Sequence, residues 1–225
     1  AQGYTIVKTA EEFINAISDS SVSNKKIILM NDISLKDFKD LQSVDFEGEI
    51  NGNGFFLANY TSKNGPLFNN VTNSTIKNLG VKNFQVEGFG ALALMMTNTD
   101  IENVYVGDST VTVNSVMYFA GGIAAGFKGG TVSNVVVNNV DIVSKNSSDP
   151  NIYIAATGGL FGAASEADIS NTSVLNSSIP IWPTSNEYYS GSILGVATGN
   201  VNLNNVSTNV YKNVSDFIGF ETEAS

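Results

Sequence analysis

The chain has 225 residues, of which 42% are hydrophobic and 14% charged, and its formal net charge is −10. It contains no Cys and no His, and all 11 basic residues are lysines, which excludes a disulfide scaffold, zinc sites built on thiolates or imidazoles, and histidine-dependent catalysis. Net acidity without a basic cluster argues against nucleic-acid binding. No apolar run reaches the ~18 residues of a membrane span, so membrane insertion is not expected.

The first part of the chain, residues 1–44, is expected to form an N-terminal cap around one short helix. Thr9 and Glu12 have the spacing of a capping box, in which the threonine hydroxyl accepts from the glutamate amide and the carboxylate reaches back. Apolar residues beginning at Phe13 then recur on one face. The pattern predicts an amphipathic helix over residues 10–18, placed to cover one end of the structure that follows.

An acidic segment comes next, in which Asp45, Glu47 and Glu49 alternate with apolar residues. Side chains two apart on a strand share a face, so a single strand over residues 45–50 would project the three carboxylates together. Such a group could bind calcium through oxygen ligands, or supply an acid–base pair for glycoside hydrolysis. A solvated outer face beside the cap is the simpler interpretation, and no other cofactor or metal is expected.

The remainder contains an imperfect repeat whose most regular feature is an asparagine two residues after an apolar anchor. The anchors are Ile76, Ile101, Val132, Ile169 and Leu203. The asparagines are Asn78, Asn103, Asn134, Asn171 and Asn205. After each of the first three anchors, apolar residues three and five positions later follow the period of a strand, with one residue spent at a corner. Asparagine tolerates the left-handed backbone that such a corner needs.

Consecutive anchors are 25 to 37 residues apart, the length of one coil of a parallel β-helix with a variable loop. The spacing is constant within each unit and variable between units. This indicates that all insertions leave from one side of the repeat. We therefore predict an all-β domain over residues 1–225: a right-handed parallel β-helix, or solenoid, with a short capping helix. Its coils would occupy residues 45–208, with the asparagines stacked as a ladder, and residues 209–225 would cap the C-terminal end.

Glycine-rich segments give this repeat a resemblance to a known family. They cover residues 121–135, 158–162 and 191–195, and residues 48–54 add the sequence GEINGNG. They resemble the GLUG-motif units of bacterial surface β-helices. That family includes adhesins, filamentous surface proteins and non-catalytic parts of bacterial immunoglobulin A proteases. The resemblance implies a secreted or cell-surface location and an adhesin-like role.

Aromatic residues in the long loops are the main candidates for ligand binding. The loop over residues 179–190 holds the only Trp of the chain, between two prolines. The residues predicted to face a ligand are Tyr118, Asp149, Tyr153, Trp182, Asn186, Tyr188 and Tyr189. If the loops leave one side, these residues gather on one edge, where aromatic faces beside amides and carboxylates suit a glycan or a protein. Alternatively, the rings fold back and cover an apolar rim of the solenoid.

Three functions remain open. The first, which we expect, is a non-catalytic binding module whose partner is a glycan or a host or cell-surface protein. The second is a polysaccharide lyase or glycoside hydrolase, as in other parallel β-helices; those enzymes resemble one another in using Arg or Lys beside Asp-bound calcium, or clustered Asp with a His. This chain has no Arg or His, and no Asp cluster adjoins Lys77 or Lys82. The third is a structural stalk whose partner is the rest of a larger polypeptide.

Overall fold

The computed structural model describes residues 3–115, 117–145, 154–180, 187–210 and 216–222. Within these residues it contains one helix and 15 strands, and every strand pairing is parallel. The first elements are β1 (Thr5–Val7), α1 (Ala10–Ser18), β2 (Lys25–Leu29), β3 (Ile33–Ser34), β4 (Val44–Phe46), β5 (Gly48–Asn51) and β6 (Phe56–Ser62). Five long strands follow: β7 (Phe68–Glu87), β8 (Ala93–Val113), β10 (Ala124–Ser144), β12 (Phe161–Leu175) and β14 (Leu194–Thr208). The short strands among them are β9 (Met117–Gly121), β11 (Ile154–Gly158), β13 (Glu187–Gly191) and β15 (Ile218–Glu221).

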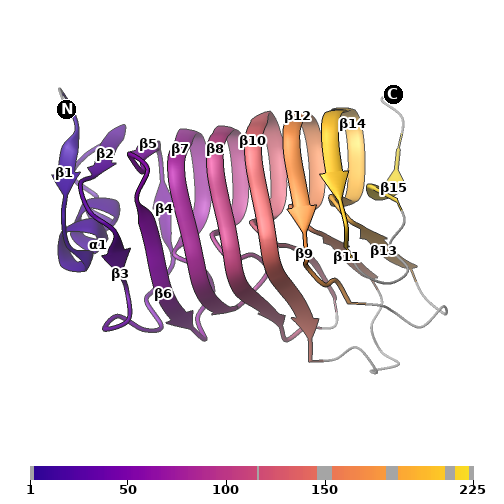
Figure 1. Ribbon diagram of the computed structural model, residues 1–225, viewed down its shortest axis with the longest axis horizontal. Coiled ribbons are helices and arrows are strands. Elements are labelled where there is room, and N and C mark those ends of the chain that lie inside the picture. The colour runs from indigo at the N-terminus through magenta and orange to yellow at the C-terminus, as the bar shows by residue number, and fades with distance from the viewer. Residues whose placement is uncertain (1–2, 116, 146–153, 181–186, 211–215, 223–225) are drawn as a thin grey trace.

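The strands follow one another along the long axis of the molecule (Figure 1). The main sheet has the order β1-β2-β5-β7-β8-β10-β12-β14-β15, so each neighbour in the sheet is the next unit in the chain. This order confirms the predicted all-β class with long, parallel, solenoid-like stacking. The sheet also runs further toward the N-terminus than the predicted coils, because β1 and β2 lie within residues 1–44.

The register of the main sheet follows the anchors found in the sequence. Successive anchors pair directly across the stack: Ile76 with Ile101, Ile101 with Val132, Val132 with Ile169, and Ile169 with Leu203. Ile27 and Ile50 extend the same row toward the N-terminus. The first four anchors are at most 1% exposed, so a continuous column of branched apolar side chains forms the core along this side.

Left-handed corners bend the long strands, at intervals of five residues in β7, β8, β10 and β12 and of six residues in β14. All five asparagines of the predicted ladder have φ between 50° and 54°. Two further rows have left-handed φ as well: Asn59, Asn83, Asp108, Asn139 and Asn176 on one side, and Asn73, Asn98, Gly129, Glu166 and Gly199 on the other. Side-chain amides connect successive coils at these corners; Asn103 Nδ2 donates to Asn78 Oδ1 at 2.9 Å, and Asn205 Nδ2 donates to Asn171 Oδ1 at 2.7 Å. The corners therefore combine the backbone bend with hydrogen bonds along the axis.

Helix α1 has the predicted bounds and lies at the N-terminal end of the stack (Figure 1). The Glu12 amide donates to Thr9 Oγ1 at 3.1 Å, while the Glu12 carboxylate accepts from the Lys8 amide rather than from Thr9. Phe13 and Ile17 are buried and the helix contacts β1, β2 and β4. At nine residues α1 is too short to cross a membrane, and no other part of the described chain forms a helix that could. At the opposite end β15 pairs with β14, and residues 211–215 lie outside the described chain.

A second, three-stranded sheet, β9-β11-β13, lies beside the C-terminal coils (Figure 1). The chain leaves each of its strands through an equivalent glycine and turns directly into the main sheet. A Cβ added at Gly121, Gly158 or Gly191 would lie between 1.9 and 2.3 Å from the carbonyl oxygen three residues later. No side chain fits there, which explains why the glycine-rich segments recur at this point of the repeat.

Candidate binding surface

The outer face of the C-terminal coils carries an apolar groove of about 280 Å³. Its floor is built from small residues in one register row, Gly126 and Ala163, with Met95 of the same row at one end. A Cβ added at Gly126 would lie 2.4 Å from Met95 Sδ, so the absence of a side chain lets Met95 lie across the floor. Lys128 and Ser165 supply part of a polar border on the next outward row.

An exposed aromatic edge borders this groove. Phe119 of β9 is 44% exposed and contributes one wall. Ala156 and Tyr189 continue the row of Phe119 across the second sheet. The Tyr189 ring lies 4.7 Å from the ring of Phe220, which is 42% exposed. We call Phe119, Tyr189 and Phe220 the aromatic edge; exposed apolar rings beside an apolar groove are typical of interaction surfaces.

The structure divides the residues that the sequence pointed to. Tyr118, expected to face a ligand, is only 4% exposed and packs 6.3 Å from the Phe89 ring, because strand alternation turns it inward and its neighbour Phe119 outward. Tyr189 lies on the outward face and is partly exposed. Tyr188 shares a register row with Tyr118, and its side chain is not described. Asp149, Tyr153, Trp182 and Asn186 lie outside the described residues.

The three insertions nevertheless re-enter the described chain side by side. Met117, Ile154 and Glu187 form one register row at the start of β9, β11 and β13. Each insertion thus ends at the same edge of the second sheet, as the variable spacing of the repeat predicts. The aromatic edge begins two residues further along each strand, at the row of Phe119 and Tyr189.

The predicted acidic strand is divided, and its carboxylates act separately. Gly48, with φ +147°, forms a corner between β4 and β5, so the expectation of one strand over residues 45–50 is wrong. Each carboxylate instead contacts the next coil: Asp45 accepts from the Asn70 amide at 3.1 Å, Glu47 accepts from Asn73 Nδ2 at 3.2 Å, and Glu49 lies 3.4 Å from Lys77 Nζ. The described residues contain no group of three His, Cys, Asp or Glu arranged to hold a metal ion.

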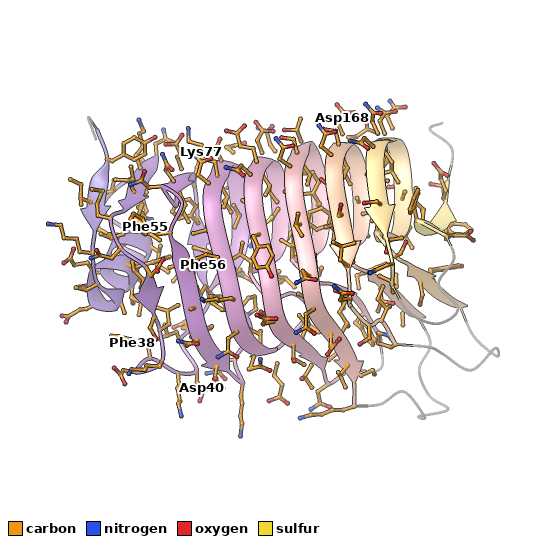
Figure 2. All side chains as sticks on the ribbon, viewed as in Figure 1. Phe38, Asp40, Phe55, Phe56, Lys77 and Asp168 are labelled. Atoms are coloured by element: carbon orange, nitrogen blue, oxygen red, sulfur yellow. The ribbon has the colours of Figure 1, made fainter. Side chains whose placement is uncertain are left out.

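Carboxylates further along the stack have the same role. Asp100 accepts from both the amide and the hydroxyl of Thr131, at 3.0 and 2.8 Å, and Asp168 accepts from Asn202 Nδ2 at 2.8 Å. Asp168 and Lys77 lie on the same upper edge of the stack in Figure 2. This edge is a polar face whose charged groups connect neighbouring coils.

No family model matches this sequence, and no curated protein matches it either. Among solved structures, the fold is similar to that of a protein from Bacteroides ovatus described as a "putative immunoglobulin A1 protease". The TM-score is 0.59 at 16% sequence identity, and the match covers 99% of this chain and 84% of the other. At this identity the likeness concerns the parallel-stranded fold.

Proposed function

We propose that the chain is a right-handed parallel β-helix module of a bacterial secreted or cell-surface protein, with a non-catalytic, adhesin-like binding role. Three observations support this proposal. The anchors pair in register along the stack, the glycine-rich corners resemble GLUG-motif units, and the fold is similar to a Bacteroides structure. The partner is a glycan or a host or cell-surface protein.

The observation that carries the binding role is the aromatic edge beside the apolar groove. Two of its rings, Phe119 and Phe220, are more than 40% exposed, and leaving large apolar groups in water is unfavourable unless a partner covers them. The groove accepts an apolar side chain or the apolar face of a sugar, and Ser165 and Lys128 offer hydrogen bonds at its border. Recognition of a partner is therefore the function that this geometry supports best.

Polysaccharide cleavage is less well supported. Acid–base cleavage needs two carboxylates that face one substrate, and the groove lining contains none; its charged member is Lys128. The described carboxylates of the acidic segment contact neighbouring coils instead. Among the described residues the groove thus offers a binding surface rather than an acid–base pair.

The proposal is tested by measuring binding of the native chain and of Phe119→Ala to glycan arrays and to panels of host surface proteins. Phe119→Ala removes one wall of the groove, so we expect at least a tenfold loss of affinity. Ile6→Ala is a matched control, because Ile6 is similarly exposed, at 45%, but lies at the N-terminal end. Equal binding by Phe119→Ala, or release of reducing sugars from a polysaccharide, would contradict the proposal. Absence of any binding would favour a stalk that packs against the rest of a larger polypeptide.

A further inference from the structure

A second groove, of about 240 Å³, lies on a different side of the stack, next to the asparagine corners. Phe56 and Tyr105 flank Gly80 in a single register row, and Val136 continues that row. Asn103 lies along the border, in the corner row that precedes these residues. Phe56 is visible on the broad face of the stack in Figure 2. This groove shares no residue with the groove beside the aromatic edge.

Two glycines leave room for the aromatic rings beside the sheet. A Cβ added at Gly80 would lie 2.4 Å from the Phe56 ring, and one added at Gly107 would lie 2.5 Å from the Tyr105 ring. The ring centroids of Phe56 and Tyr105 are 6.2 Å apart with an interplanar angle of 73°. Both rings are partly exposed. Because neither glycine has a side chain, each ring occupies the space beside a glycine, and the two rings form a partly exposed edge-to-face pair.

Polar groups that remain able to bind a ligand surround the rings. The side-chain amide of Asn103 has two hydrogens. One of them is donated to Asn78, and the contact with Asn78 does not use the other. Tyr105 Oη accepts from Asn138 Nδ2 at 3.1 Å, which leaves the phenolic hydrogen to donate. Lys82 Nζ lies 4.7 Å from the Phe56 ring centroid. The groove lining thus presents aromatic rings together with neutral amide and hydroxyl groups, and one cation, Lys82, lies beside Phe56.

Charge selects among the ligands that fit this chemistry. The groove lining contains no carboxylate, but the chain as a whole has a net charge of −10, which repels a polyanion. A peptide of apolar side chains would leave the asparagine amides and the tyrosine hydroxyl unpaired, at a free-energy cost. A neutral sugar satisfies both halves of the surface, since its C–H face covers a ring and its hydroxyls pair with amides.

We infer that this groove is a binding site for a neutral oligosaccharide, with one sugar unit against Phe56 and Tyr105 and its hydroxyls at Asn103. The chain of sugars lies along the stack, because the asparagine corners repeat in that direction at the spacing of neighbouring strands, about 4.8 Å. This site goes beyond the proposed function of the aromatic edge and stands independently of it.

Affinity electrophoresis in native gels tests the inference, with galactomannan, xyloglucan, mixed-linkage β-glucan or α-mannan as neutral probes and polygalacturonate as a polyanionic probe. We expect the native chain to be retarded by at least one neutral polysaccharide and not by polygalacturonate. Tyr105→Ala should weaken the retardation at least tenfold, whereas Tyr105→Phe, which keeps the ring, should retain most of it. Ile6→Ala, which truncates an exposed apolar side chain outside both grooves, should migrate like the native chain.

No retardation of the native chain in any neutral gel, retardation by polygalacturonate alone, or equal retardation of Tyr105→Ala would overturn the inference. Circular dichroism checks that each variant is folded. Should Tyr105→Ala not fold, Asn103→Gly provides the same test, since glycine keeps the left-handed corner while removing the amide. Loss of retardation in Tyr105→Ala with unchanged binding to a protein partner of the aromatic edge would separate the two sites.

Discussion

The N-terminal and C-terminal coils share one core but differ on the outside. In the N-terminal coils, outward side chains connect neighbours through charge and amide contacts, as with Asp45 and Asn70 or Glu49 and Lys77. In the C-terminal coils, the row of Asn70 continues through Met95 as the small residues Gly126 and Ala163, and a second sheet lies beside them. Anchors and corners are common to both regions, so the stack is specified by the interior and the bends. The outer positions are free to differ, and the insertions occur where the apolar groove lies.

The largest expected effects come from breaking the shared core in each region. Phe68 and Phe161 are each at most 1% exposed, in the N-terminal and C-terminal coils respectively. Phe68→Ala and Phe161→Ala should each lower the free energy of unfolding by about 3–5 kcal/mol, because each leaves a cavity. Urea unfolding followed by circular dichroism measures this.

One cooperative transition in both variants would agree with a single core. Phe119→Ala is the control, since truncating an exposed side chain should change stability by no more than about 0.5 kcal/mol. Two separate transitions in either core variant would show that the regions unfold independently, contrary to a shared core.

A smaller effect is expected at the corners, which both regions have in common. Asn103 has φ 53° and donates to Asn78. Asn103→Ala should cost about 1–2 kcal/mol, because alanine disfavours the left-handed conformation and the hydrogen bond is lost. Asn103→Gly should cost less, because only the hydrogen bond is removed. Thermal or urea unfolding of the pair measures the difference, and equal losses would mean that the corner conformation contributes nothing.

The smallest effect at neutral pH concerns a buried tyrosine of the N-terminal coils. Burial raises the pKa of Tyr60, and its Oη accepts from the Leu41 amide at 3.1 Å. The folded state therefore retains the phenolic proton at pH values where the unfolded chain loses it, above about pH 10. The free energy of unfolding should be insensitive to this group below pH 10 and should fall as pH rises further. Urea titrations between pH 9 and 11 would reveal this fall, and Tyr60→Phe should show a shallower one; identical slopes would contradict the assignment.

Local signals in the sequence predicted the helix and the repeat. The capping box at Thr9 marks the start of α1, and the five anchors predict the pairing from Ile76 to Leu203. Ile27 and Ile50 were not recognised as members of the anchor row, because the corners that follow them are spaced differently. The left-handed residue after Ile50 is Asn53, three residues later instead of two. Two residues after Ile27 the chain has Leu29 instead of an asparagine.

The binding surfaces depend on which residues of neighbouring strands lie side by side. Local sequence signals, which predicted the helix and the repeat, do not reveal this alignment. Whether Tyr118 or Phe119 faces outward is set by where β9 enters its sheet, and the groove beside Phe119 combines residues from several strands. The pairing of Phe56 with Tyr105 needs the alignment of coils across Gly80. Comparison of residues four positions after each anchor would have placed Gly80, Tyr105 and Val136 in one row, which is the signal that could have found this groove.

The central claim is that equal positions on successive coils lie side by side, and paired cysteines test it most directly because the natural chain has none. Ser133 pairs in register with Ser170, which pairs in register with Asn204. Neighbouring strands are about 4.8 Å apart, within the Cα–Cα range of a disulfide. Mild oxidation should therefore cross-link the variant Ser133→Cys/Ser170→Cys, detected as a faster-migrating band on a denaturing gel. The variant Ser133→Cys/Asn204→Cys, two coils apart, should remain uncross-linked; equal or preferential linkage of that second pair would contradict the stacked-coil account.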